Sequence, residues 1–459
     1  MLKKILSKTS GIYFMCVISI SIASLIPIIS RATDTLTAIF ILPVVLAVMC
    51  IISYGAGRTE KLLERYVRGD GIISDRIFCI LAVILLILQI NFAFIQDFVP
   101  KNDLSYICTG AENMVRGKAL YDGIPEIHGH YFSVYPNNHM IFTLIYILYR
   151  IEYILTGDIR NIFPTIINIV SLDVSYIIMY RISRSTDTPE RSLMCAVRGL
   201  LLTPFITYTA FFYTDSLAMP YVTGAIYFYL RYIDKYRLSD IMICGILTAI
   251  GYKFKGSVGL IIPAIILDML VNRRRNGVKV ITLTITVFAV ICMIISKITC
   301  GVINIDSAEL ERYKFPLIHW VMMSLHGRGG YCGEDFRYTL SFVGYGNKIN
   351  ADMLRMTEKL SEMGVTGFLM HLSEKTAYTW RDGTYMTGYY NKYRFLESNI
   401  FYIIVSALHF RMLYRISRKY ITGKFNISEI TLIILSMFLL VWETRCRYLV
   451  SFFPLLILI

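Results

Sequence analysis

Long apolar segments recur along the chain, and polar or basic loops separate them. A helix that crosses a membrane needs roughly 20 mostly apolar residues. The pattern therefore predicts an all-α polytopic membrane protein with a helical bundle of about twelve spans. The longer apolar segments are residues 11–30, 36–54, 77–97, 162–180, 193–211, 278–300, 397–416, 428–442 and 446–459, and two shorter ones are 240–252 and 257–271.

The distribution of Lys and Arg predicts which loops stay in the cytoplasm, because cytoplasmic loops are enriched in both residues. Lys3, Lys4 and Lys8 place the N-terminus inside, and the loop around Arg65 returns to the same side. Other clusters, around Arg184, Arg274 and Arg415, also belong inside. The third span then leads the following polar loop to the outer face.

Residues 138–155 affect on which side of the membrane all later loops are predicted to lie. If this segment and 162–180 both crossed the membrane, the cluster around Arg184 would lie outside. The segment is short and has Asn137 and Asn138 at its start. We therefore expect it to be a re-entrant or interfacial helix on the outer face.

This threading divides the chain into five parts. They are N-terminal spans at 1–97, a first outer loop with interfacial helices at 98–161, a central bundle at 162–300, an outer loop segment at 301–396, and C-terminal spans at 397–459.

The composition agrees with a membrane protein. Hydrophobic residues make up 56% of the 459 residues and charged ones only 17%, which is low for a soluble chain. The net charge of +14 follows from the basic cytoplasmic loops, so we expect no nucleic acid as a partner. The ten cysteines form no CxxC pair and are scattered through apolar segments, where they act as small hydrophobic residues.

The first outer loop carries candidate chemistry. Asp103 follows the third span, where a carboxylate could act as general base toward an acceptor hydroxyl, and Glu112 lies further along. The alternative is that Asp103 only begins a helix. Asn137 and Asn138 could bind sugar hydroxyls or cap a helix, and capping is the better interpretation of these two alone.

Asp215 lies where two apolar segments meet on the outer side. It could cap a helix, bind an acceptor, or join Asp103 in holding a divalent cation through oxygen ligands. The sequence leaves the metal open and predicts no other cofactor.

Several cations fall on the outer side, against the usual bias. Lys255, Arg445 and Arg447 sit at helix ends, and Tyr448 follows them. Each cation could extend to an interface on its own, but together they indicate an anionic ligand such as a lipid phosphate. His319 and Trp320, in the long outer segment, are typical of carbohydrate-binding loops.

Together these motifs resemble the GT-C superfamily of membrane glycosyltransferases, which includes protein O-mannosyltransferases and the aminoarabinose transferase that acts on lipid A. The resemblance runs from about residue 98 to 459, and the long outer segment resembles a Gram-positive branch. It rests on Asn102-Asp103, Tyr135-Pro136-Asn137-Asn138, Asp215, Lys255-Gly256 and the stretch Glu443 to Tyr448. The sequence departs from the family pattern in having Leu104 after Asp103 where a second acid is common, and in having two additional spans before the motif loop.

The resemblance implies a GT-C-like bundle and an inverting transfer of a sugar from a polyprenyl-phosphate donor. The acceptor would be a glycan, lipid or protein of the cell envelope, on the extracytoplasmic face of the plasma membrane. Asp103 would deprotonate the acceptor, Asp215 would position hydroxyls, and Lys255, Arg445, Arg447 and Tyr448 would bind the lipid phosphate. Two alternatives remain: a polysaccharide polymerase or ligase, and a transporter or flippase for lipid-linked sugars.

Overall fold

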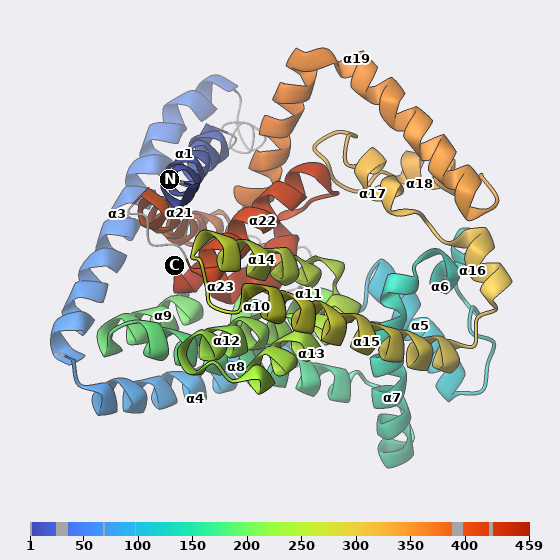
Figure 1. The fold of residues 1–459 in the computed structure, drawn as a ribbon, viewed down its shortest axis with the longest axis horizontal. Coiled ribbons are helices and arrows are strands. Elements are labelled where there is room, and N and C mark those ends of the chain that lie inside the picture. Colours follow the sequence, from blue (N-terminus) through green and yellow to red (C-terminus); the bar gives the residue numbers. More distant parts are fainter. Residues whose placement is uncertain (1, 24–34, 68, 97, 388–397, 422–425) are drawn as a thin grey trace.

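The computed structural model describes residues 2–23, 35–67, 69–96, 98–387, 398–421 and 426–459. Within these ranges the chain is helical and contains no strand, as the hydrophobic pattern predicts (Figure 1). The α-helices are α1 (Leu2–Ala23), α3 (Thr35–Val67), α4 (Gly71–Ile95), α5 (Asp103–Val115), α6 (Tyr131–Val134), α7 (His139–Thr156), α8 (Ile162–Thr186), α9 (Pro189–Leu201), α10 (Pro204–Thr207), α11 (Thr214–Leu217), α12 (Met219–Lys235), α13 (Leu238–Phe254), α14 (Ile261–Val271), α15 (Gly277–Ile303), α16 (Ser307–Tyr313), α17 (Leu317–Met323), α18 (Gly333–Leu340), α19 (Tyr345–Trp380), α21 (Asn399–Ile421), α22 (Ile427–Val441) and α23 (Phe453–Leu458). Short 3₁₀ turns are η1 (Glu126–His128), η2 (Pro136–Asn138), η3 (Gly256–Leu260) and η5 (Cys446–Phe452).

The helices α8, α12, α13 and α15 lie side by side in the middle of the molecule, and α4 packs against α8 (Figure 1). Only Tyr236 and Arg237 separate α12 from α13, so these two helices form an antiparallel hairpin. The start of α12 and the end of α13 therefore lie at the same end of the bundle. That arrangement brings the segments that carry Asp215 and Lys255 together.

The helix α7 runs across this bundle instead of along it (Figure 1). It contacts α8 and α15, and the Sγ of Cys300 lies 3.7 Å from Nδ1 of His139. This orientation is the one expected of an interfacial helix. The segment Pro136–Thr156 is nevertheless long and apolar enough to span a membrane, so its interfacial position stays a prediction.

Five helices in the described part of the chain are long and apolar enough to cross a membrane, fewer than the predicted twelve. They are Gly71–Ile95, Pro136–Thr156, Ile162–Thr186, Gly277–Ile303 and Ile400–Ile421. The predicted first span, 11–30, enters residues 24–34, which lie outside the described ranges. The total number of spans stays a prediction.

The predicted span 193–211 is wrong, because the helix is interrupted. Helix α9 ends at Leu201, Thr203 has a left-handed backbone with φ of 71°, and Pro204 begins the short helix α10. Proline cannot continue a helix and keeps the preceding residue out of the α-helical region. The chain from 207 to 219 is then entirely buried.

Buried irregular backbone in a membrane protein needs internal hydrogen-bond partners. Two polar side chains on neighbouring helices supply them. The Nδ2 of Asn168 in α8 donates to the carbonyls of Tyr208 and Thr209, at 2.7 Å each, and the Nε2 of Gln89 in α4 donates to the carbonyl of Phe205 at 2.9 Å. These bonds hold the segment that leads to Asp215.

The predicted span 446–459 is also wrong. It forms the 3₁₀ turn η5 and the short helix α23, and Phe452, Phe453, Leu455 and Leu456 are fully buried. The apolar run faces other helices of the protein, which explains its composition without a lipid-facing surface.

The outer loop segment predicted at 301–396 is helical where it is described, with residues 388–396 outside the described ranges. It contains α16 to α18 and the long, bent helix α19, which forms an arch in Figure 1. The bend is at Gly364, whose φ of 57° is readily accessible only to glycine.

Candidate functional site

Asp103 is the first residue of α5 and is half-exposed. Its Oδ1 accepts a hydrogen bond of 3.1 Å from the hydroxyl of Tyr131, and that hydroxyl accepts one of 2.6 Å from Nδ2 of Asn138. Tyr131 and Asn138 are buried, so they fix the direction of the carboxylate. The first motif loop and the Tyr-Pro-Asn-Asn motif therefore meet in one hydrogen-bonded chain.

Asp215 lies in α11 and is fully buried between two cations. Nζ of Lys255 donates to its Oδ1. Nε of Arg447 lies 3.2 Å from its Oδ2, an ion pair that lacks the alignment of a hydrogen bond. The side chains of Lys255 and Arg447 are only 11% and 13% exposed, so little water screens the three charges.

Three helix ends position these charges. Asp215 precedes α12, Lys255 follows the last residue of α13, and Arg447 is in η5. The hydroxyl of Ser451, also in η5, donates to the backbone carbonyl of Asp215 at 2.8 Å. Segments almost 240 residues apart are thus joined by a backbone contact and an ion pair at the same residue.

Tyr213 connects Asp103 with the three charges. The guanidinium of Arg447 lies over its ring, with 5.4 Å from Cζ to the ring centroid. Burial and then the negative charge of Asp103 raise the pKa of Tyr213, while the positive charge of Arg447 opposes them. Asp103 and Arg447 therefore both lie near enough to Tyr213 for their charges to affect this phenol.

Tyr448 and Glu443 complete the cationic side. Nζ of Lys255 lies 4.6 Å from the centroid of the Tyr448 ring, a cation–π contact. Glu443 is buried, with Nε of Arg445 at 3.7 Å from its Oε1. Burial raises the pKa of the Glu443 carboxyl, although the charges of Arg445 and Arg447 oppose the effect. With Glu443 ionised, the carboxylates of Asp215 and Glu443 and the cations Lys255, Arg445 and Arg447 together carry a net charge of +1.

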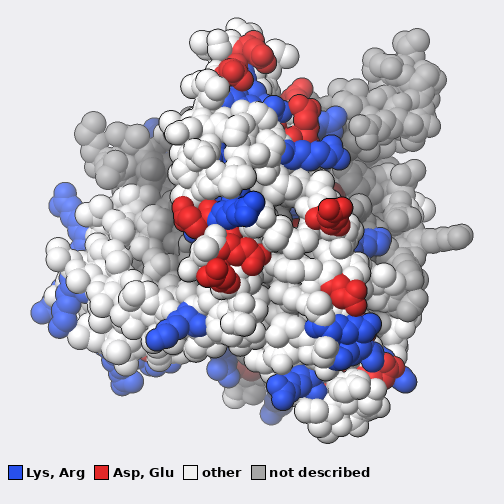
Figure 2. All heavy atoms as spheres, turned by 90° about the vertical axis from the view of Figure 1, so that its right-hand side faces the viewer, with Lys and Arg blue, Asp and Glu red and all other residues white. Residues whose placement is uncertain are grey.

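Figure 2 shows the end of the molecule at which α5, α7 and α16 lie. Acidic and basic side chains alternate along the middle of this face, and no large patch of one sign is visible. The cations that could select an anion are therefore the buried ones, Lys255 and Arg447, and not a basic surface.

The remaining predicted residues occupy different places. Glu112 pairs with Arg116 at 2.7 Å and lies nine residues beyond Asp103 on α5, about 13 Å along the helix axis. Asn137 is exposed and donates to Asn138 at 3.2 Å. Among the described residues, neither side chain forms a hydrogen bond or an ion pair with Asp215, Lys255 or Arg447, and their binding role stays a prediction.

His319 and Trp320 are neighbours that point in different directions. His319 is fully buried, and its Nδ1 lies 2.7 Å from the hydroxyl of Thr339. Burial lowers the pKa of His319 to about 3, so the imidazole is neutral at neutral pH. Trp320 instead reaches the site, because its ring centroid lies 5.8 Å from that of Tyr135. The binding role predicted for both residues stays a prediction.

Two further residues at the site carry no sequence signal. His128 in η1 lies close enough to Asp103 for the two charges to interact; burial lowers its pKa and Asp103 opposes the effect. Lys375 in α19 is buried under the loop that contains Gly329. A Cβ atom added at Gly329 would lie 2.8 Å from Cδ of Lys375. Burial lowers the pKa of Lys375 to about 7, and Glu443 opposes the shift. A loop histidine and a helical lysine are too common to be singled out from sequence.

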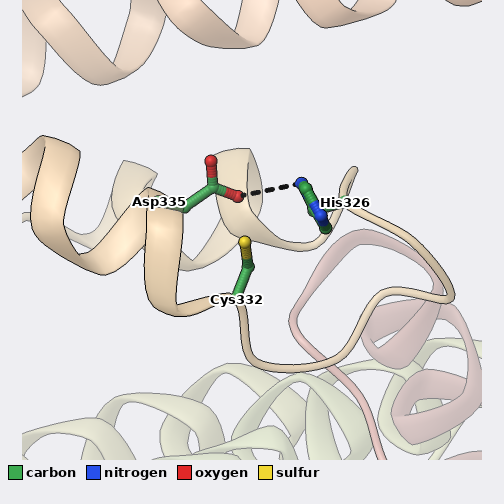
Figure 3. Close-up of side chains that lie close together, drawn as sticks. All are labelled: His326, Cys332 and Asp335. Carbon is green, nitrogen blue, oxygen red and sulfur yellow. Dashed lines mark ion pairs between the residues drawn. The ribbon is translucent and has the colours of Figure 1, made fainter.

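One group of three potential metal ligands occurs among the described residues: His326, Cys332 and Asp335 (Figure 3). The buried Asp335 carboxylate lies 3.8 Å from the His326 ring, but it also pairs with Lys359 at 2.7 Å and Arg355 at 2.9 Å. A divalent cation here would lie beside two positive charges, so we assign no metal to this group. The alternative of a cation between Asp103 and Asp215 is disfavoured in the same way, because Lys255 and Arg447 already occupy Asp215.

A family model described as a conserved hypothetical integral membrane protein matches residues 10–388. That stretch includes Asp103, Asp215 and Lys255 and ends before Arg447. No curated protein matches the chain.

Proposed function

The chain belongs to the family of conserved hypothetical integral membrane proteins, and we propose that it is a GT-C-type glycosyltransferase. It would transfer a sugar from a polyprenyl-phosphate donor to a cell-envelope acceptor on the extracytoplasmic face of the plasma membrane. One observation carries the proposal: a partly buried carboxylate, Asp103, and a buried cation, Arg447, act on the same phenol, Tyr213, and Arg447 shares Asp215 with Lys255. Inverting sugar transfer requires a base on one side of the anomeric carbon and anion stabilisation on the other.

In the proposed reaction, the acceptor hydroxyl oxygen attacks the anomeric carbon and passes its proton to Asp103. The bond between the anomeric carbon and the phosphate oxygen breaks, and its electron pair leaves with the polyprenyl phosphate. Lys255 and Arg447 stabilise the charge of the leaving phosphate. Buried cations do this more effectively than exposed ones, because water does not screen them.

For Asp215 we propose the role of a counter-ion in place of the positioning of hydroxyls that the resemblance implies. Both of its oxygens face cations, which supports this proposal. We propose that it fixes the distance between Lys255 and Arg447 before the donor binds. Preorganised charges need no rearrangement when the phosphate develops its charge.

Donor binding and catalysis are tested separately. Decaprenyl phosphate, the part common to all such donors, is titrated into the purified chain in detergent. Lys255→Met and Arg447→Gln should bind it at least about tenfold more weakly, the loss expected for one charge-assisted contact. Asp103→Asn should bind it like the wild type, because this carboxylate faces the acceptor.

Catalysis is measured as transfer of radiolabelled hexoses from decaprenyl-phosphate donors to cell-envelope extract in proteoliposomes. Asp103→Asn should lower the rate by about 10²–10⁴-fold, the usual contribution of a general base. Asp122 is an exposed acid of the same first outer loop as Asp103. Asp122→Asn therefore serves as the matched control and should keep the wild-type rate. Wild-type transfer by a folded Asp103→Asn protein would exclude the proposed base.

A further inference from the structure

A second cluster of charges surrounds a cavity at the other end of the bundle. The cavity has a volume of about 890 Å³ and is lined by the last turn of α8, by α9, by the end of α21 and by the start of α22. Helix α8 has 25 residues and is about 37 Å long, and it separates this cavity from the site at Asp215. The cationic lining residues are Arg191, Arg198, Arg415, Arg418 and Lys419, and the acidic ones are Glu64, Asp187 and Glu429.

Glu60 pairs with three arginines, two of which, Arg198 and Arg415, line this cavity. Its carboxylate lies 3.0 Å from Arg198, 2.9 Å from Arg411 and 3.0 Å from Arg415. Burial favours the neutral acid, but the charges and hydrogen bonds of these arginines lower the pKa of Glu60 to about 2. One ionised carboxylate against three guanidiniums leaves two positive charges without compensation.

The other cations divide into paired and unpaired ones. Lys419 lies 2.7 Å from the buried Glu429, and Arg191 lies 3.5 Å from Asp187. Arg418 makes no ion pair with any residue that the structure describes, and it is exposed. The cavity therefore has an excess of positive charge that comes from Arg198, Arg415 and Arg418.

Apolar residues also line the cavity: Ile182, Leu230, Ile457 and Leu458. A ligand that fits both kinds of lining has an anionic group and an apolar part, or else an anionic group surrounded by water. The volume is in the range of pockets that bind small molecules and is far larger than a halide needs.

We propose that this cavity binds a phosphate-bearing anion, with the phosphate held by Arg198, Arg415 and Arg418. Planar guanidinium groups match phosphate oxygens and are weakly hydrated, so they bind phosphate more readily than lysine ammonium groups do. The phosphate has two sources, a membrane lipid headgroup and a free phosphate. By the charge distribution of the loops, this end faces the cytoplasm, where anionic lipids and soluble phosphates are both present.

The test uses the full chain purified in detergent. Thermal stability and binding are measured during titration with dioleoyl-phosphatidylglycerol, with dioleoylglycerol as the matched lipid that lacks phosphate, and with inorganic phosphate. Saturable binding of phosphatidylglycerol alone assigns the site to a lipid. Saturable binding of inorganic phosphate, in competition with the lipid or without lipid binding, assigns it to a free phosphate.

Arg418→Gln is the decisive variant, because this exposed side chain has no ion-pair partner to lose within the described ranges. It should weaken binding of the phosphate-bearing probe at least about fivefold, as expected for a partly exposed charge-assisted contact. Arg275→Gln is the matched control: Arg275 is also exposed, and its predicted side of the membrane is the same. It should leave the affinity unchanged within about twofold, since distant charges are screened.

A second variant protects the test against a misfolded protein. Arg415→Gln leaves Glu60 paired with Arg198 and Arg411, so no buried carboxylate is stranded, and the double variant with Arg418→Gln should bind more weakly than either single one. The proposal is overturned if neither probe binds saturably, if dioleoylglycerol binds as well as phosphatidylglycerol, or if Arg275→Gln weakens binding as much as Arg418→Gln.

Discussion

Replacing Asp215 by Asn tests whether the buried charges at the site act as one unit. The carboxylate is fully buried, and it is the shared partner of Lys255 and Arg447. The substitution keeps the side-chain shape and removes the charge. Two cations, 11% and 13% exposed, are then left beside each other in a region that water hardly reaches.

The expected loss follows from that geometry. Removing one member of a buried ion pair typically lowers the free energy of unfolding by about 3–5 kcal/mol, because the remaining charge is uncompensated. Here one change strands two charges, so Asp215→Asn should fall at the upper end of about 3–5 kcal/mol. Lys255→Met should cause a smaller loss, since Asp215 keeps Arg447.

Unfolding is followed in detergent mixed with increasing sodium dodecyl sulfate, by the fluorescence of Trp320, Trp380 and Trp442. The double variant Asp215→Asn with Lys255→Met leaves one of the two cations that lose Asp215 as their counter-ion. It should be more stable than Asp215→Asn alone by about 1–3 kcal/mol, the coupling expected for residues in contact. Such a recovery cannot come from general damage to the fold.

Glu112→Gln provides the reference for an ordinary ion pair. Glu112 is 43% exposed and pairs with Arg116, so its loss should change the free energy of unfolding by less than about 1 kcal/mol. If Asp215→Asn is no more damaging than Glu112→Gln, or if adding Lys255→Met makes it worse, the three charges do not form a coupled buried unit.

Three further predictions address the fold. The buried Glu152 accepts hydrogen bonds from the backbone N–H groups of Arg160 and Ile162, at 2.8 and 3.2 Å, where α8 begins. Glu152→Ala should therefore lower the free energy of unfolding by about 1–3 kcal/mol in the same assay. An unchanged free energy of unfolding would contradict this anchoring role. Gly364→Ala should destabilise the arch of α19 by about 1–2 kcal/mol because of its φ of 57°, measured by proteolysis rate, with helical Gly367→Ala as the control that should not destabilise it. Since the pKa of His319 is lowered to about 3 in the folded protein by burial, the unfolded chain takes up a proton first, so stability should fall as pH drops from about 6.5 toward 3. His319→Asn should show a weaker dependence in this window, and an identical profile would exclude His319 as its source.

The contact of Asp215, Lys255 and Arg447 follows from features that are visible in the sequence. Each is a charge at the end of an apolar segment, and the positions of the basic loops predict that all three lie on one side of the membrane. Charges at membrane depth need partners, so residues of opposite sign on the same side are expected to meet. The sequence could not indicate that Asp215 would use both of its oxygens for cations, because this depends on the packing of η5 against α11.

The sequence indicates the interruption of the helix at Thr203, although the hydropathy of the segment does not show it. Pro204 stands inside the apolar run 193–211, and proline in a helix interior ends or kinks it. The apolar run 446–459 carries the same signal, because Pro454 stands in the first turn of α23. Composition reports that a segment avoids water, and it cannot distinguish contact with lipid from contact with other helices.

His128 and Lys375 reach the site only through the tertiary fold. The first lies in a short 3₁₀ turn of the outer loop, and the second lies on the far arm of α19, beyond the bend at Gly364. Their distance in sequence from Asp103 and Glu443 gives no hint of contact. The bend of α19 determines which of its side chains face the site. No hydrophobic periodicity in the sequence indicates which side chains these are.

The joining of Asp215 to η5 has a consequence for biosynthesis. As the chain leaves the ribosome and enters the membrane, α4, α8 and α13 are inserted long before residues 446–452 are made. Until then Asp215 has Lys255 but neither Arg447 nor the hydrogen bond from Ser451 to its carbonyl. A nascent chain that stalls before residue 446 therefore lacks both links that join Asp215 to the C-terminal part of the chain, and Lys255 is then its one ion-pair partner among those three residues.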